Sequence, residues 1–247
     1  MHITDYTLYG AITLILSMIF SMGGSGSGIA LIPVLSFLGL DFLYAKAYGL
    51  FAGATTTITS SVMNIKRGVV NIKEALPIAI AMLIFAPIGA YLSKYINQEL
   101  VKILFMVLLF YSASMMLFGK KKAVFKVSSK LVLFFVGSFV GISAGLLGIG
   151  GGNILIPLLV MLGFEPKKVA TSVSFIVPFS ALSSFATYAS IINLDYKLLA
   201  TIAICAIIGG YIGNYMMQFK LNQKQVKKLL AFMLYVLAFK MLWVLFL

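Results

Sequence analysis

The sequence is poor in charged residues, cysteine and histidine. Of its 247 residues 10% are charged and 62% are hydrophobic, whereas about 25% of the residues of a soluble domain are charged. This composition excludes a soluble globular protein and predicts an integral membrane protein. The single cysteine, Cys205, excludes an internal disulfide and has no partner for a metal site. The single histidine, His2, lies at the amino terminus.

Acidic residues are also scarce, and their positions exclude several kinds of chemistry. No carboxylate or histidine falls in the middle of an apolar segment, where a proton relay or a cation site would need one. The buried ionisable groups that an embedded hydrolase or metalloenzyme requires are missing as well. We therefore predict no catalytic residues, no metal and no cofactor. All six acids fall at segment ends or in loops: Asp5, Asp41, Glu74, Glu99, Glu165 and Asp195.

An internal repeat is the most informative feature that is present. In each half a glycine run interrupts an apolar stretch, once in Met22–Pro33 and once in Leu146–Pro157. Matching residues recur at a spacing of 124, so the chain contains two copies of one unit. We place the copies at residues 1–121 and 126–247, within one transmembrane domain. The matching residues are Gly24, Gly26, Gly28 and Pro33 in the first copy and Gly148, Gly150, Gly152 and Pro157 in the second.

The apolar segments predict an all-α polytopic membrane protein. At 1.5 Å per residue, segments 28–39 and 152–163 reach only about 18 Å, short of a hydrocarbon core of about 30 Å. Each half is therefore expected to contain one glycine-broken helical hairpin and three transmembrane helices. The predicted segments are 6–22, 28–39, 45–64, 74–93 and 100–118 in the first half, and 131–147, 152–163, 168–190, 197–217 and 225–246 in the second.

The basic residues predict the topology. If each broken hairpin crossed the membrane as one kinked span, the 19 lysines and arginines would divide into 10 and 9. If each hairpin enters and leaves on the same side, they divide into 14 and 5. Cytoplasmic loops carry the excess of basic residues, which favours the second arrangement. Each half then crosses an odd number of times, so the two repeats are inverted and both termini lie outside. The smaller group is Lys46, Lys94, Lys102, Lys197 and Lys240.

The two glycine runs form the predicted substrate site. A short helix begins at each run, deep in the membrane, with unpaired amides and a partial positive charge at its amino end. In an inverted pair the two helix ends approach from opposite faces and converge on one anion site. The alternative is that the glycines only allow helices to pack closely. The candidate binding residues here are Ser25, Gly26, Ser27, Gly28, Gly150, Gly151, Gly152 and Asn153.

A hydroxyl-rich segment follows each broken hairpin. At helical spacing Thr57, Ser60 and Asn64 share one face, and the matching segment of the second half begins with Thr171 and Ser172. These side chains are candidates for a neutral donor lining along the path of a permeating anion. Alternatively, the hydroxyls bond back to their own helix or join helices together. Both interpretations stay open at this point.

The clearest form of the repeated motif is Gly148–Pro157, followed by Ala170–Ser172 at the start of the next segment. This duplicated pattern resembles the TauE/SafE sulfite exporter family, and the resemblance covers the whole chain. The first copy departs from it, because Ser25 and Ser27 lie within the glycine run and Lys46–Tyr48 stands where the Ala-Thr-Ser pattern is expected. The resemblance implies export of sulfite, sulfoacetate or related organosulfonates.

We therefore expect a secondary carrier of the cell membrane that exports a small sulfur-containing anion. A negative interior drives anions outward by about 2.3 kcal/mol per charge per 100 mV, so no coupling ion is required. The expected partners are the anionic substrate and the lipid bilayer, without nucleic acid, and no oligomeric state is predicted. The alternatives are an importer of another small solute, such as an amino acid, and a non-catalytic membrane scaffold.

Labelling of introduced cysteines tests the predicted topology. A cysteine at position 121 should react only from the cytoplasm, and a cysteine at position 96 only from outside. The two positions flank a single predicted span, so membrane-impermeant maleimide applied to each face of oriented vesicles distinguishes them. Reaction of both positions from the same face would contradict the inverted arrangement.

Overall fold

The computed structural model describes residues 3–118, 129–162, 164, 166–219 and 223–246. All ten predicted segments are helices, with ends that differ by a few residues from the sequence prediction. The predicted boundary between the repeats, at residues 121 and 126, lies outside the described residues. The helices are α1 (Ile3–Ser21), α2 (Gly28–Phe37), α3 (Phe42–Lys66), α4 (Ile72–Leu92), α5 (Gln98–Phe118), α6 (Lys130–Leu147), α7 (Gly152–Met161), α8 (Pro166–Ala189), α9 (Tyr196–Phe219) and α10 (Gln223–Phe246).

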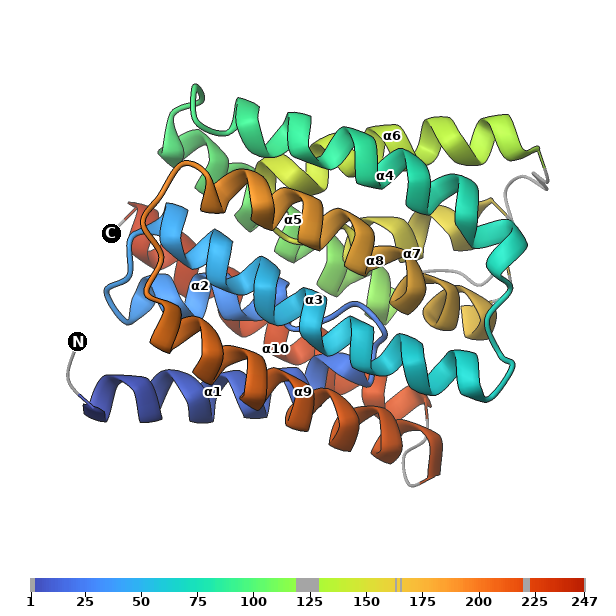
Figure 1. Ribbon diagram of the computed structural model, residues 1–247, viewed down its shortest axis with the longest axis horizontal. Coiled ribbons are helices and arrows are strands. Elements are labelled where there is room, and N and C mark those ends of the chain that lie inside the picture. Colours follow the sequence, from blue (N-terminus) through green and yellow to red (C-terminus); the bar gives the residue numbers. More distant parts are fainter. Residues whose placement is uncertain (1–2, 119–128, 163, 165, 220–222, 247) are drawn as a thin grey trace.

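The helices run along the long axis of one bundle, in which α1 begins and α10 ends at the same end (Figure 1). Six of them, α4, α5, α6, α8, α9 and α10, are long and apolar enough to cross a membrane. Helix α3 has 25 residues but is less apolar because it carries threonines and serines. Helices α2 and α7 have 10 residues each, about 15 Å, in agreement with the prediction that neither spans the membrane.

The two halves of the chain interlock through glycine contacts. Helix α4 packs on α6, and α9 packs on α1, so each pair joins one half to the other. A Cβ at Gly89 would overlap the carbonyl of Ile142, and a Cβ at Gly213 would overlap the carbonyl of Met18. Gly213 follows Gly89 by 124 residues, as Ile142 follows Met18. Close approach through small residues is a common way for helices to associate in membranes, and here it holds the halves in one bundle.

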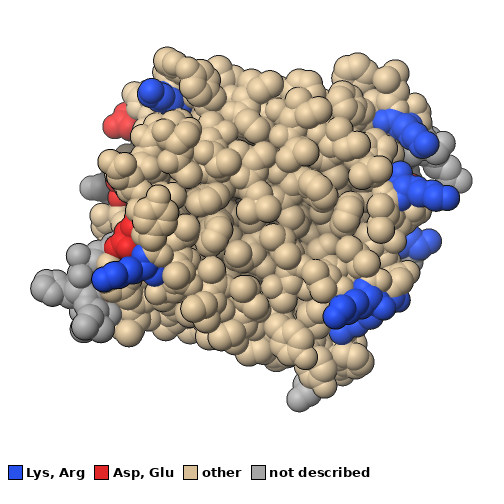
Figure 2. Space-filling view, viewed as in Figure 1, with Lys and Arg blue, Asp and Glu red and all other residues tan. Residues whose placement is uncertain are grey.

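Charged side chains gather at the two ends of the bundle. Figure 2 shows lysines and arginines at both ends of the long axis, with a broad uncharged face between them. At one end the Thr171 hydroxyl donates to the Val69 carbonyl, and Arg67 lies over the Phe219 ring. At the other end Tyr6 donates to Asp195. An uncharged band between two charged rims is what a bilayer requires of a membrane-spanning bundle; which rim faces the cytoplasm stays a prediction.

Hydrogen bonds of Asp195 link α1 to the start of α9. Its carboxylate accepts from the Tyr6 hydroxyl and from the backbone amides of Lys197 and Leu198, while its own amide donates to the Tyr48 hydroxyl. The hydrogen bond from Tyr6 favours the ionised form and lowers the pKa of Asp195 below its ordinary value of 3.8. This loop therefore contributes stability while the carboxylate is ionised, and it loses that contribution as the pH falls through the lowered pKa.

Replacement of Asp195 should expose this contribution. We expect Asp195→Asn to lower the Tm at pH 7, and the gap between variant and wild type to shrink below about pH 4 as the native carboxylate is protonated. Thermal unfolding in detergent at several pH values measures both effects. Glu99→Gln, at an exposed carboxylate, is the control. A gap that stays constant down to pH 3 would show that Asp195 does not act through its charge.

Candidate functional site

Each broken hairpin turns through glycines with positive φ angles. In the first turn, residues 22–27, Gly24 and Gly26 both have φ of 77°. In the second, residues 148–151, Gly148 has φ of 79° and Gly150 has φ of 70°. These angles lie in the left-handed region that residues with a side chain rarely adopt. The same conformation thus recurs at equivalent positions of the two copies, and each turn leads into a helix of 10 residues.

The two turns contact each other inside the bundle. A Cβ added at Gly152 would lie 3.0 Å from Ser25 Cα, and one added at Gly28 would lie 3.9 Å from the Ile149 carbonyl oxygen. The first residue of α7 therefore lies against the first turn, and the first residue of α2 lies near the second. The structure brings together the two glycine runs, which are more than 120 residues apart in the sequence.

The long helices α3 and α8 back the two turns in equivalent ways. A Cβ at Gly26 would lie 2.9 Å from both the Gly53 carbonyl oxygen and Thr57 Cγ2 on α3. A Cβ at Gly150 would lie 3.2 Å from Val177 and 3.3 Å from Ala181 on α8. Gly53 and Thr57 precede Val177 and Ala181 by 124 residues. The Ser180 hydroxyl, 2.6 Å from the Gly150 carbonyl oxygen, fixes the second turn further.

At the first turn, the Ser27 hydroxyl forms hydrogen bonds with two other hydroxyls. Its hydroxyl lies 2.9 Å from that of Ser17 and 3.2 Å from that of Thr56, and these two hydroxyls are 3.1 Å apart. All three side chains are fully buried. The triangle ties α1, α3 and the start of α2 together, so Ser27 contributes to the shape of the turn and its hydroxyl is already engaged.

Ser25 and Asn153 are the polar side chains at the turns that lack partners. Ser25 is 2% exposed and Asn153 is 2% exposed, yet neither the Ser25 hydroxyl nor either polar atom of the Asn153 amide forms a hydrogen bond with the described residues. Two other buried hydroxyls are unpartnered as well: that of Ser184, one helical turn beyond Ser180 on α8, and that of Ser112 on α5. An unsatisfied buried polar group costs about 1–3 kcal/mol. Such groups need a partner that the described residues do not supply, such as a water molecule, an ion or a ligand.

The electrostatics at the turns favour an anion. The first amides of α2 and α7 have no partner within their own helix, and neither N-cap residue, Ser27 or Gly151, supplies a side-chain hydrogen bond. Each helix start also carries a partial positive charge. Among the described residues no three metal-ligating side chains lie together. The two helix ends, together with the Ser25 hydroxyl and the side-chain amide of Asn153, can therefore bind a small anion by hydrogen bonds.

The hydroxyls of α3 mostly bond to their own helix. Thr57 donates to the Gly53 carbonyl, and Ser60 donates to the Thr56 carbonyl. Asn64 is engaged across helices, since its amide donates to the Ser174 hydroxyl and its oxygen accepts from Gln218. These contacts agree with the packing alternative for Ser60 and Asn64. Of the three, Thr57 contacts a glycine turn, through its methyl group at Gly26.

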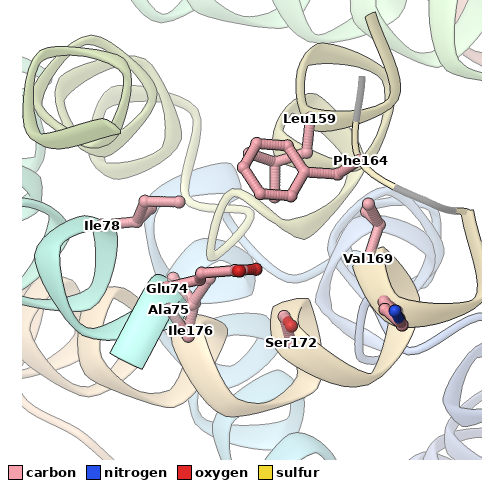
Figure 3. A pocket seen from close by; sticks show the side chains of 9 residues that line it. Glu74, Ala75, Ile78, Leu159, Phe164, Val169, Ser172 and Ile176 are labelled. Atoms are coloured by element: carbon pink, nitrogen blue, oxygen red, sulfur yellow. The ribbon is translucent and has the colours of Figure 1, made fainter. Parts of the chain in front are cut away.

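Thr171 and Ser172 contact other parts of the bundle. Thr171 bonds to the Val69 and Lys168 carbonyls. Ser172 lines a small pocket between α4, α7 and α8. Figure 3 shows Glu74 and Ser172 on one side of this pocket, with Leu159 and Phe164 on the other. The residue of this motif that meets a turn is Ala170, whose carbonyl oxygen would lie 2.5 Å from a Cβ at Gly24.

Sequence reasoning missed one ionisable group in the interior. Lys46 was expected at the outer rim, but its side chain is 0% exposed, so the prediction that buried ionisable groups are missing is wrong at this position. Its stem packs on the second turn, where a Cβ at Gly148 would lie 2.7 Å from Lys46 Cγ. One feature of the sequence sets Lys46 apart: Lys46–Tyr48 differs from Ala170–Ser172, the equivalent residues of the second copy.

Interrupted helices that meet in the interior of a bundle are a feature of many secondary transporters. The chain belongs to the sulfite exporter TauE/SafE family, whose sequence profile matches residues 9–241. It is 30% identical over 239 residues to a probable membrane transporter protein of Methanocaldococcus jannaschii, which covers 89% of this chain and 87% of that relative. The molecule is therefore a multi-pass membrane transporter, and membership of the family implies a transport role and not an enzymatic one.

Two further relatives agree with this assignment. The chain is 26% identical over 240 residues to the probable membrane transporter protein YunE of Bacillus subtilis, across 85% of this chain and 87% of that protein. A shorter stretch of 60 residues is 45% identical to sulfite exporter TauE/SafE family protein 6 of Arabidopsis thaliana, across 24% of this chain and 14% of that protein. No solved structure matches the chain significantly.

Removal of the unpartnered groups should separate function from stability. Ser25→Ala and Asn153→Ala each remove a buried polar group that has no protein partner, so we expect an unchanged or higher Tm together with transport at least tenfold slower. Ser180→Ala is the matched control, because its hydroxyl holds the Gly150 carbonyl and its loss should lower the Tm. Thermal unfolding and flux into liposomes measure the two effects. Normal transport by both Ser25→Ala and Asn153→Ala would rule these side chains out as ligands.

Proposed function

We propose that this transporter exports a small sulfur-containing anion, such as sulfite, sulfoacetate or a related organosulfonate, across the cytoplasmic membrane. The anion binds between the two glycine turns, where it accepts hydrogen bonds from Ser25, from Asn153 and from the first amides of α2 and α7. The observation that carries this proposal is the pair of buried, unpartnered side chains at the meeting point of two helix ends.

The chemistry of the site supports a sulfur oxyanion in particular. A sulfonate or sulfite group presents three oxygens around one sulfur atom, and it accepts hydrogen bonds from several directions at once. Two opposed helix ends supply amides from two directions, and the hydroxyl of Ser25 and the amide of Asn153 supply more. The described acids lie at helix ends and connections, so no carboxylate competes with the anion for these donors.

The position of the acids at the ends of the bundle also indicates the driving force for transport. A carrier that moves protons through the membrane needs a titratable carboxylate or histidine along the path. Glu74, in the first turn of α4, and Asp195, before α9, are both at the ends of the bundle. The anion is therefore expected to move down its electrochemical gradient, with the membrane potential as the driving force.

Flux from liposomes at a controlled potential tests the proposal. Ethanesulfonate, which stays monovalent across the neutral range, is loaded into vesicles that contain the purified protein. A negative interior should speed its efflux, and valinomycin with balanced potassium should slow it. Protein-free vesicles are the control.

Two results would count against this account. Absence of protein-dependent sulfonate or sulfite flux at any potential would remove the proposed substrate class. Flux of ethanesulfonate that follows an imposed pH gradient at zero potential would reveal a proton site, and Glu74→Gln and Asp195→Asn would then locate it.

A further inference from the structure

Lys46 is a buried basic residue that lies beside the second of the two turns. It is the fifth residue of α3 and is fully buried. Its stem crosses the second turn, since a Cβ at Gly148 would lie 2.7–2.9 Å from its Cγ, Cβ and Cδ atoms. The equivalent position in the other half is Ala170, whose backbone meets Gly24 at the first turn. In both copies this position therefore contacts a glycine turn, but it is a lysine in the first copy and an alanine in the second.

The ammonium group of Lys46 is surrounded by neutral partners. Its Nζ donates to Ser93 Oγ at 2.6 Å and to Gln98 Oε1 at 3.1 Å. It also lies 5.2 Å from the ring centroid of Phe42 and 5.1 Å from that of Tyr188. Among the described residues no carboxylate forms an ion pair with it. Asp41, which is near in sequence, accepts from the amide of Leu43 at the start of α3.

This environment supplies hydrogen bonds and aromatic rings but no opposite charge. Removal of an ammonium group from water costs several kcal/mol, and neutral acceptors and aromatic rings recover only part of that cost. An alanine at this position would avoid the cost, as Ala170 does in the other half. Ionisable residues retained inside a membrane protein generally face a substrate path. The partner that Lys46 lacks is an anion.

The contacts of Tyr188 connect Lys46 to the second turn. The Tyr188 hydroxyl donates to the Gly145 carbonyl at 2.9 Å, and Gly145 lies in the last turn of α6, directly before the glycine run. The ring that faces the ammonium group is therefore fixed to the same backbone that the lysine stem crosses. Ser93 and Gln98 are neutral, so an anion can take their place on the ammonium group without leaving another charge unpaired.

We propose that Lys46 is the counter-ion of the transported anion between the second turn and the end of the bundle that carries Asp195, and that it sets the charge selectivity of the carrier. This inference rests on the proposed function, since it takes the substrate to be an anion. A fixed positive charge attracts a divalent anion more strongly than a monovalent one at the same distance. Removal of the charge should therefore reduce transport of the divalent anion preferentially.

The test compares two anions that differ in charge. Sulfoacetate is divalent at pH 7.5, and ethanesulfonate is monovalent. We expect the ratio of sulfoacetate to ethanesulfonate flux in liposomes to fall about tenfold in Lys46→Gln, and to be retained in Lys46→Arg. Lys102→Gln is the matched control: Lys102 Nζ lies 5.6 Å from the same Phe42 ring, but its side chain is only partly buried. This control should keep the wild-type ratio.

The ratio does not depend on how much protein is active, so it remains informative if a variant inserts poorly. Lys46→Met, with an unbranched apolar chain over Gly148, is a second neutral variant, and whichever neutral variant folds must show the reduced ratio. Equal loss of both fluxes, with an unchanged ratio, would mean that Lys46 only fastens α3 to Ser93 and Gln98, and would overturn the inference. Wild-type vesicles that carry neither anion would instead contradict the proposed function, and the inference with it.

Discussion

The structure depends on two helices that begin inside the bundle. Backbone amides at a helix start need partners, and in a membrane water does not provide them. At the two glycine turns each copy reverses direction, and each helix start lies against the turn of the other copy. The buried hydroxyls of Ser17, Ser27 and Thr56 fix one turn, and Ser180 fixes the other. Ser25 and Asn153 stay without hydrogen-bond partners beside the turns, and a ligand can bind there.

The packing of the two halves on each other supports the two turns inside the bundle. Helices α4 and α9 each leave their own half and pack on the long arm of the opposite hairpin, α6 and α1 respectively. Gly89 and Gly213 allow backbones to approach at these contacts. Neither hairpin is therefore supported by its own half alone. A change in one half is therefore expected to move the turn of the other.

Much of this could be predicted from the sequence, because the relevant signals are local. Apolar length gave all ten helices, and the 124-residue repeat gave the two turns. The roles of individual side chains could not be predicted in this way. Ser25 and Ser27 are alike in sequence, and they differ only because Ser17 and Thr56 reach one of them. Lys46 lies near the start of an apolar segment, which predicts a rim position, and its burial depends on Ser93, Gln98 and Tyr188 from distant segments.

Direct location of a bound anion tests whether the substrate binds between the two glycine turns. Crystals of the protein grown with 2-bromoethanesulfonate would allow the bromine to be found by anomalous scattering, with the sulfonate placed beside it. We expect the sulfonate between the two glycine turns, within hydrogen-bond distance of Ser25 Oγ and Asn153 Nδ2. A sulfonate bound only in the pocket lined by Glu74 and Ser172, with Ser25 and Asn153 still unpartnered, would contradict it.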